Sequence, residues 1–332
     1  MAREVQHMAT TSLQSLGYLP VATASLRPES VLECDLYIQR PGRPYAELYR
    51  GSTYPLEVAD VERLAADGVD HLYIRLEEAE AYRDYLCKHL LHDKTVPLAA
   101  RVQALREVTR VAFQDALTSN DADQIVNVAS PFGGSLATMV AEQSLPFREL
   151  FATLEHDYHT FTHVCNVSVY CTMLAIQLGT CTDAMTLGEL ATGGLLHDIG
   201  KRHIPPHVLN KLGKLSDEEW ELIRQHPTSG YRELATRADL TWGQLMMVYQ
   251  HHERLDGSGY PSGIPAAEIH PWARICCVVD VFDAMTSHRP YRRPMPTAQA
   301  CDFLNKHAGV WFDAEAVACW TSHVRSTAAT AS

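Results

Sequence analysis

The segment Gly194–Lys201 combines an apolar run with three side chains that could do chemistry. Its residues, GLLHDIGK, place His197, Asp198 and Lys201 at the end of a pattern that predicts a buried helix. Adjacent side chains diverge on a helix, so His197 and Asp198 cannot enclose a metal ion alone. They can supply an imidazole and a bridging carboxylate if other segments bring more ligands. A metal ion would also remove the cost of burying an unpaired carboxylate.

Further candidate ligands interrupt other helical stretches of the chain. Each one alone is explained as well by a satisfied core residue or a helix end, and His-Asp pairs also occur at 92–93 and 156–157, where they carry little meaning. Histidine and aspartate side chains that arrive together from separate helices are harder to explain in that way. The candidates are His163, His226 at the end of a predicted helix, His251, His252 and Asp280.

With His197 and Asp198, these residues make seven nitrogen or carboxylate donors. One metal ion takes roughly four to six ligands, so the set fits two ions that share a carboxylate. Two ions about 3.5–4 Å apart can bridge a hydroxide and clamp a phosphoryl group for in-line attack. Mixed nitrogen and oxygen donors favour iron or manganese, with nickel or zinc as alternatives, over calcium. The set therefore predicts phosphodiester hydrolysis.

Composition limits the class of protein and its partners. The chain has 332 residues, 46% hydrophobic and 20% charged, which is globular and long enough for two domains. A net charge of -12 argues against sequence-independent binding to a nucleic acid polymer. Nine cysteines without a C-x-x-C pair predict a reducing, cytoplasmic location. No signal peptide and no apolar run of about eighteen residues is apparent, so we expect no membrane span.

The N-terminal half predicts a small α+β module behind a flexible lead-in. Residues 1–30 contain Pro20 and Pro28 and are expected to be flexible, and residues 31–95 form the module. The module's expected strands are 31–38, 45–49 and 69–76, and its expected helices are 58–66 and 77–91. Residues 96–150 predict a helical connector, with a helix over 98–117, an interruption at 131–134 and a further helix from Ser135 towards Glu142.

Residues 151–325 predict an all-α domain of the helical-bundle type. Asp183 or Thr182 is the expected cap of one helix, Ser216 and Glu219 form a capping box for another, and Pro271 suits the first turn of a third. The expected helices cover 160–178, 182–197, 216–226, 241–252 and 271–285. The predicted fold class is thus an α+β N-terminal module followed by an all-α domain.

Three motifs of this domain resemble the HD-GYP class of the HD superfamily of metal-dependent phosphohydrolases. They are HDIGK at 197–201, HHERLDGSGYP at 251–261, and DVFDAMT at 280–286 followed by RPYR at 289–292. Shorter similarities lie between them, at 204–205, 210–211 and 213–216. The resemblance spans roughly residues 157–307, about half of the chain, and the motifs are long and ordered.

The resemblance implies a bacterial cyclic di-GMP phosphodiesterase that produces pGpG, GMP or both. It implies one metal site from His163, His197, Asp198 and Asp280, and a second from Asp198, His226, His251 and His252, so that Asp198 bridges two divalent ions. Lys201 would contact the scissile phosphate, which makes Asp198 and Lys201 the expected catalytic residues. The implied substrate contacts are Lys201, Gly259, Tyr260, Pro261, Asp283, Arg289 and Arg292.

One position departs from the class. Members with a third metal ion have a glutamate four residues before the first histidine, and this chain has His159 there. The departure favours two ions per chain, with His159 as an optional extra ligand on the same helix face as His163.

Two alternatives to this function stay open. The domain could be a catalytically weak cyclic di-GMP receptor that signals through the N-terminal module, or a phosphodiesterase for another cyclic dinucleotide. The module resembles regions found ahead of HD-GYP domains, which favours regulation or formation of a homodimer through the N-terminal half or the connector helices.

Overall fold

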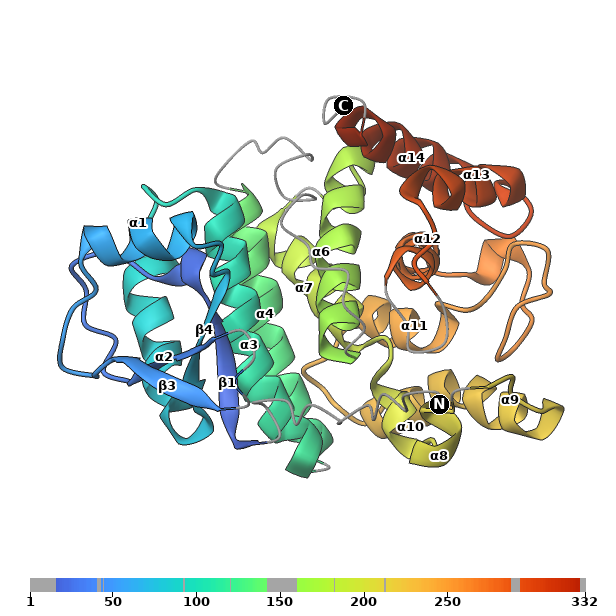
Figure 1. Cartoon of the computed structure of the whole chain (residues 1–332). Coiled ribbons are helices and arrows are strands. Elements are labelled where there is room, and N and C mark those ends of the chain that lie inside the picture. Colours follow the sequence, from blue (N-terminus) through green and yellow to red (C-terminus); the bar gives the residue numbers. More distant parts are fainter. Residues whose placement is uncertain are drawn as a thin grey trace, which may run out of the picture. The chain divides into compact units, whose positions relative to one another are not determined.

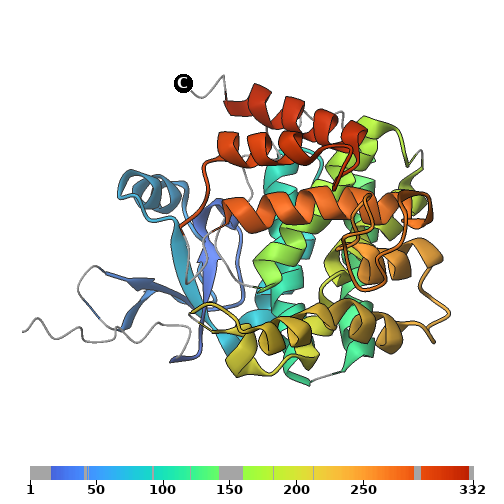
Figure 2. The same ribbon diagram turned by 90° about the vertical axis from the view of Figure 1, so that its right-hand side faces the viewer.

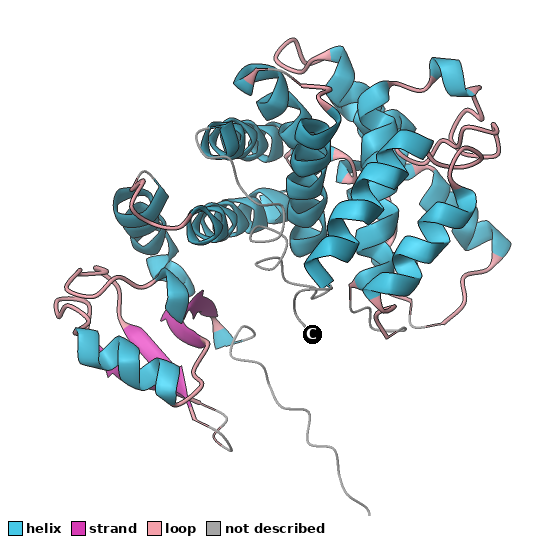
Figure 3. Cartoon of the chain, turned by 90° about the horizontal axis from the view of Figure 1, so that it is seen from above, coloured by secondary structure: helices cyan, strands magenta, loops and turns pink. Residues whose placement is uncertain are grey.

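The computed structural model describes residues 16–40, 43, 45–91, 93–119, 121–141, 160–181, 183–211, 213–287 and 293–328. The chain forms two compact units, residues 1–111 and 112–332, and the boundary between them falls inside helix α3. The course of the chain through both units can be followed by colour in Figure 1. The strands belong to the N-terminal unit, as Figure 3 shows in magenta.

The N-terminal unit is built on a four-stranded antiparallel sheet with the order β1-β4-β2-β3. Apolar residues on the strands and helices, among them Leu19, Val21, Leu72 and Ile74, form its core. Its elements are β1 (Tyr18–Ala22), η2 (Thr23–Ser25), β2 (Leu36–Gln39), β3 (Ala46–Arg50), α1 (Val58–Ala66), β4 (His71–Arg75), η3 (Leu76–Glu78), α2 (Ala79–Leu86) and η4 (Cys87–Leu91).

Two expectations for this unit need correction. The flexible lead-in does not extend to residue 30, because residues 18–22 form strand β1 with Leu19 and Val21 buried. Pro20 is compatible with this strand since β1 is an edge of the sheet, where a missing N–H costs little. The strand expected over 31–38 begins only at Leu36, because Glu33 has a φ of 60°, which interrupts extended backbone.

The connector contains α3 (Leu98–Ser119), close to the predicted helix, and then α4 (Ala122–Ala141). The interruption expected at 131–134 is wrong, because α4 continues through it. Gly133 is required there by a close helix contact: a Cβ at this position would overlap Thr192 Oγ1 and the carbonyl oxygen of Gly188 on α7. Helix α4 packs along α7, so it belongs to the helical unit.

The helical unit confirms the all-α expectation among its described residues. The helix predicted over 160–178 has those bounds, and the caps at Asp183 and at Ser216 with Glu219 are present. Figure 2 shows α12, α13 and α14 stacked beside one another. The further elements are α6 (Thr160–Leu178), α7 (Ala184–Leu196), η5 (Ile199–His203), α8 (Pro206–Leu209), α9 (Asp217–Arg224), α10 (His226–Leu234), α11 (Trp242–Gln250), η6 (Ala266–Glu268), α12 (Pro271–Thr286), α13 (Thr297–His307) and α14 (Ala314–Ala328).

Helix α6 is the central element of this unit. Its segment Phe161–Leu178 is long and apolar enough to cross a membrane by length and composition, but 78% of it is buried inside the structure. Tyr170 on α6 packs edge-on against Trp320 of α14 and Phe282 of α12, with ring centroids 4.9 and 6.0 Å away. The helix therefore has the burial of a core helix, and it holds His163 at a fixed place.

Candidate metal centre

Five separate helical segments bring the predicted ligands to one place. His163 comes from α6, His197 and Asp198 follow the end of α7, and His226 begins α10. The remaining donors are His251 and His252, directly after α11, and Asp280 in the middle of α12. All seven are buried except His252, which is partly exposed.

The donors form two clusters. His163, His197 and Asp280 make one, and Asp198, His226, His251 and His252 make the other. Within each cluster the candidate ligand atoms all lie within 4.8 Å of one another. The second cluster has the four members that the resemblance implies, and the first has its implied members except Asp198, which the resemblance assigns to both.

The two carboxylate oxygens of Asp198 face different clusters. Asp198 Oδ2 lies 3.4 Å from both His163 Nε2 and His197 Nε2. Asp198 Oδ1 lies 3.3 Å from His226 Nε2 and 3.7 Å from His251 Nε2. Asp198 therefore lies between the two clusters, with one oxygen towards each.

Several of these atoms lack the hydrogen bonds that buried polar atoms normally make. Among the described residues, His163 Nε2, His197 Nε2 and Asp198 Oδ1 are buried without a hydrogen-bond partner. An unsatisfied buried polar atom costs about 1–3 kcal/mol. The three atoms converge on the two clusters, and imidazole and carboxylate donors without thiolate suit divalent transition metals. The residues therefore fit divalent metal ions.

Backbone carbonyl groups fix the orientation of three of the histidines. His197 Nδ1 lies 2.7 Å from the Gly194 oxygen, His226 Nδ1 2.7 Å from the Ile223 oxygen, and His251 Nδ1 3.0 Å from the Met247 oxygen. A carbonyl oxygen only accepts, so each Nδ1 carries the proton and donates it. In the neutral imidazole, each Nε2 is then the atom that can bind a metal ion, and it faces the clusters.

Asp283 does not have the expected role of a substrate contact. Its side chain is fully buried, with Oδ2 2.7 Å from His163 Nδ1 and 3.2 Å from the Ser287 hydroxyl that donates to it. Asn166 donates a second hydrogen bond to Oδ1 at 2.8 Å. Asp283 thus orients His163 and is closed off from the surface. Its position three residues after Asp280, on the same face of α12, was the available sequence signal.

The carboxylates of the centre are held ionised. Burial opposes ionisation of Asp198, but Lys201, whose Nζ lies 2.5 Å from Oδ2, and the neighbouring histidines hold its pKa well below the usual range. Burial likewise opposes ionisation of Asp280, but the neighbouring imidazoles, His163 first among them, outweigh it and lower this pKa. The centre therefore offers two negative charges to a cation.

The pKa values of the histidines are shifted in different directions. Burial and neighbouring imidazoles lower the pKa of His251 well below its ordinary value and that of His252 to about 3, so both are neutral, as metal ligands must be. Burial also opposes protonation of His163, but the nearby carboxylates of Asp198, Asp280 and Asp283 outweigh it and raise its pKa. A metal ion in the centre would take the place of that proton.

His226 begins a helix, contrary to the expectation that it ends one. Helix α9 stops at Arg224, Gln225 links the two helices, and α10 starts at His226 with Pro227 in its first turn. A proline is tolerated there because the first N–H groups of a helix have no intrahelical partner. The sequence did not separate the two helices, because the single residue Gln225 links them.

The Gly259–Pro261 loop covers the side of the centre at His252. The Tyr260 ring lies 4.7 Å from the His252 ring, and the Tyr260 N–H donates to the His252 oxygen at 3.2 Å. Gly259 is needed because a Cβ there would overlap the Arg254 nitrogen. Glu253, which the sequence motifs did not single out, is buried and accepts hydrogen bonds from the Ser262 and Gly263 N–H groups at 2.7 and 3.1 Å.

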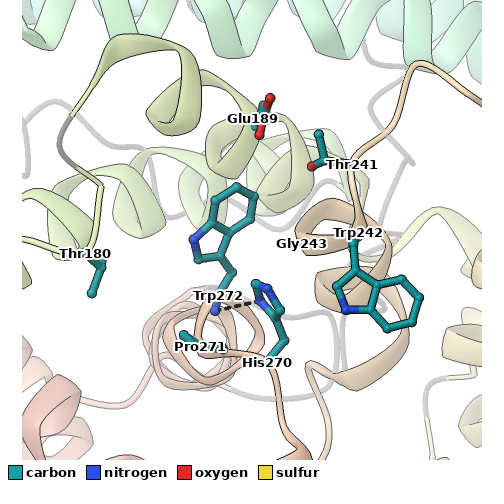
Figure 4. Close-up of a pocket in the computed structure, with 8 residues that line it drawn as sticks. All are labelled: Thr180, Glu189, Thr241, Trp242, Gly243, His270, Pro271 and Trp272. Carbon is teal, nitrogen blue, oxygen red and sulfur yellow. Dashed lines mark hydrogen bonds between the residues drawn. The ribbon is translucent and has the colours of Figure 1, made fainter.

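A cavity of about 590 Å³ adjoins this loop and includes His252 and Tyr260 in its wall. A second pocket, of about 530 Å³, lies around Trp242 and Trp272, with His270 accepting a hydrogen bond from the Trp272 N–H (Figure 4). None of the seven donors lines that second pocket. Three residues of the predicted site, His159, Arg289 and Arg292, lie outside the described part of the chain.

Comparison with known proteins places the chain in a family. The sequence model of the HD domain family matches residues 150–316, which are 167 of the 332 residues. The chain belongs to the HD domain family. The resemblance to the HD superfamily is thereby confirmed, together with the helical fold of this part of the chain.

Relatives that are named for an activity match about the same share of the chain. The cyclic di-GMP phosphodiesterase PA4108 of Pseudomonas aeruginosa is 40% identical over 144 residues, 43% of this chain and 34% of its own length. The 3'3'-cGAMP-specific phosphodiesterase 1 of Vibrio cholerae is 41% identical over 148 residues, 44% of this chain and 33% of its own length. The chain thus spans about a third of the length of these relatives.

A solved structure is similar over most of the chain. Bd1817, an HDG"Y"P protein from Bdellovibrio bacteriovorus, matches with a TM-score of 0.68 at 20% identity, covering 93% of this chain and 99% of that one. At this identity the likeness concerns the fold. Its coverage extends beyond the HD domain into the N-terminal unit.

Proposed function

We propose that this chain is a metal-dependent phosphodiesterase that hydrolyses the cyclic dinucleotide cyclic di-GMP to pGpG, GMP or both. The observation that carries the proposal is the position of Asp198, whose two oxygens face two separate clusters of histidine and aspartate side chains that could bind metal ions. Two relatives are named as phosphodiesterases, one for cyclic di-GMP and one for 3'3'-cGAMP, and their names support this substrate class.

Two divalent ions, iron or manganese by preference, would be held as follows. His163, His197, Asp198 and Asp280 would bind one, and Asp198, His226, His251 and His252 would bind the other, which accounts for the unsatisfied atoms of the centre. When bound, such a pair supplies positive charge to phosphate oxygens and lowers the pKa of water to near neutrality. The bridge at Asp198 would fix the spacing of the pair.

The other residues of the centre have roles that follow from their contacts. Lys201 is paired with Asp198, yet its side chain is 24% exposed, so its ammonium can also reach a phosphate oxygen as a point charge. Asp283 holds His163, and Glu253 holds the loop that places Tyr260 over His252. Tyr260 keeps its proton, because burial raises its pKa, and its hydroxyl can donate to an anionic ligand.

The test is hydrolysis by protein loaded anaerobically with Fe(II) or Mn(II). We expect two ions per chain and turnover of cyclic di-GMP, with pGpG and GMP separated by chromatography. Cyclic di-GMP that binds but is not cleaved with any metal would support the receptor alternative instead. Because relatives of similar identity are named for cyclic di-GMP and for 3'3'-cGAMP, a panel of cyclic dinucleotides decides between those substrates.

A further inference from the structure

The cavity beside the Gly259–Pro261 loop is lined by charged and aromatic side chains that are not needed to cleave a phosphodiester. His252 and Tyr260 connect it to the metal centre. The rest of its wall includes Arg254 and the aromatic residue Trp311, with two carboxylates, Asp217 and Glu221, from α9. Arg224 also lines the cavity and pairs with Glu221 at 3.1 Å. A phosphate group would use neither carboxylate, so this part of the wall suits another part of a ligand.

Trp311 is a support rather than a free stacking surface. The imidazole of His307 stacks on its ring with centroids 3.9 Å apart and planes 14° apart. The guanidinium carbon of Arg254 lies 3.9 Å from the centroid of the same indole ring. Two groups at this distance cannot share one face, so the indole lies between them. Arg254 therefore makes a cation–π contact with Trp311.

Further bonds tie Arg254 to this place. The Leu255 N–H donates to the Trp311 carbonyl oxygen at 3.2 Å, which joins the two segments. Arg254 Nη1 donates to the Ser258 hydroxyl at 3.4 Å. Arg254 thus lines the cavity with a guanidinium that is held by Trp311 and Ser258, and such a fork of donors suits a planar ligand with two acceptors.

Two carboxylates in the cavity wall supply hydrogen-bond acceptors, which complement the donors of Arg254. Asp217 and Glu221 lie one helical turn apart on α9 and line the same cavity. Guanine has acceptors at O6 and N7, which an arginine binds in a bidentate manner, and donors at N1 and N2, which a carboxylate accepts. Adenine instead has an amino group where guanine has O6, and it would face the guanidinium with a donor.

We propose that this cavity is a guanine-binding subsite and that Arg254, supported by Trp311, determines its preference for guanine over adenine. The proposal rests on the proposed function, because the base would belong to the nucleotide whose phosphate lies at the metal centre. Asp217 or Glu221 accepts from the donor edge of the base.

The test compares cyclic di-GMP with cyclic di-AMP on the full-length, metal-loaded protein. We expect kcat/KM to favour cyclic di-GMP, and Arg254→Gln to reduce this preference roughly 10- to 100-fold. Trp311→Ala should act in the same direction, and Trp311→Phe should restore part of the preference. Hydrolysis of methyl p-nitrophenyl phosphate, which has no purine, is measured on the same variants, and we expect Arg254→Gln to lose more of its guanine preference than of this activity. Arg325→Gln, at an exposed helix position, is the matched control.

A binding measurement separates this inference from the proposed function. Calorimetry of GMP and AMP on the same proteins should show that Arg254→Gln weakens GMP and leaves AMP nearly unchanged. If no phosphodiester is cleaved but GMP binding depends on Arg254, the proposed function fails and the subsite is supported. If cyclic di-GMP is cleaved and folded Arg254→Gln protein keeps both the guanine preference and the GMP affinity, the subsite proposal is overturned.

Discussion

At the scale of single residues, both donor clusters depend on Asp198, because each of its oxygens faces one of them. We therefore predict that Asp198→Ala removes both ions and lowers hydrolysis by about 1000-fold or more, since a metal pair contributes several kcal/mol to transition-state stabilisation. Metal analysis of the purified variant, with Asp302→Asn at an exposed position as control, measures this. Two ions per chain retained in Asp198→Ala would contradict the bridging role.

Asp283 allows a sharper test, because two roles for it predict different results. If it orients His163, Asp283→Asn weakens metal binding by about 10- to 100-fold, the usual effect of losing the partner of a metal-binding histidine. Ser287→Ala removes only the weaker bond to the same carboxylate and should change the metal affinity by less than about threefold. Metal titration decides: unchanged affinity with a raised KM would return Asp283 to a substrate contact.

The residues of the centre differed in how far the sequence could predict them. Histidines and aspartates inside apolar helical stretches were recognisable by type, and the division of the seven donors into two sets followed from the family resemblance. The partners of those ligands were not recognisable, because the bond between Asp283 and His163 joins helices far apart in the chain. Glu253 was missed for the same reason: its role as an acceptor depends on the path of the loop, which only the folded chain defines.

At the scale of elements, the contact of α4 with α7 depends on the absence of a side chain at Gly133. We predict that Gly133→Ala lowers the free energy of unfolding by about 1–3 kcal/mol, as overpacking of a close contact does. Gly134→Ala is the matched control, because nothing lies within 4 Å of a Cβ there and alanine favours a helix by about 0.5–1 kcal/mol. Denaturant unfolding of both variants should give opposite signs. Equal effects would show that the glycines act only through helix propensity.

Helix bounds in the helical unit were predictable because caps and apolar spacing are local signals, as α6 and the caps at Asp183 and Ser216 show. The errors arose where the conformation of a residue depends on contacts with residues that are distant in the sequence. Pro131 and Gly133 look like a helix end, but Gly133 lies at a helix crossing. Likewise, Pro20 looks like part of a lead-in, but it lies on an edge strand that β4 stabilises.

At the scale of the whole molecule, the boundary between the units was the least predictable feature. It falls within α3, a continuous helix whose apolar spacing does not change at residue 111. The helical unit also begins before the segment that matches the HD domain family, since it includes α4. The domain start expected at residue 151 leaves that helix out, because a helix that packs on the domain has the same sequence pattern as one that only connects to it.

This difference predicts how shortened chains behave. A chain of residues 121–332 keeps α4 against α7, whereas a chain of residues 151–332 removes the buried side chains of Phe132 and Leu136. Each such side chain contributes about 1.5–3 kcal/mol of burial, against a total stability of about 5–15 kcal/mol for a typical domain. We expect the longer piece to unfold cooperatively and the shorter one to unfold at much lower denaturant concentration. Both lack the sheet, so the comparison isolates α4, and equal unfolding midpoints would show that α4 is only a connector.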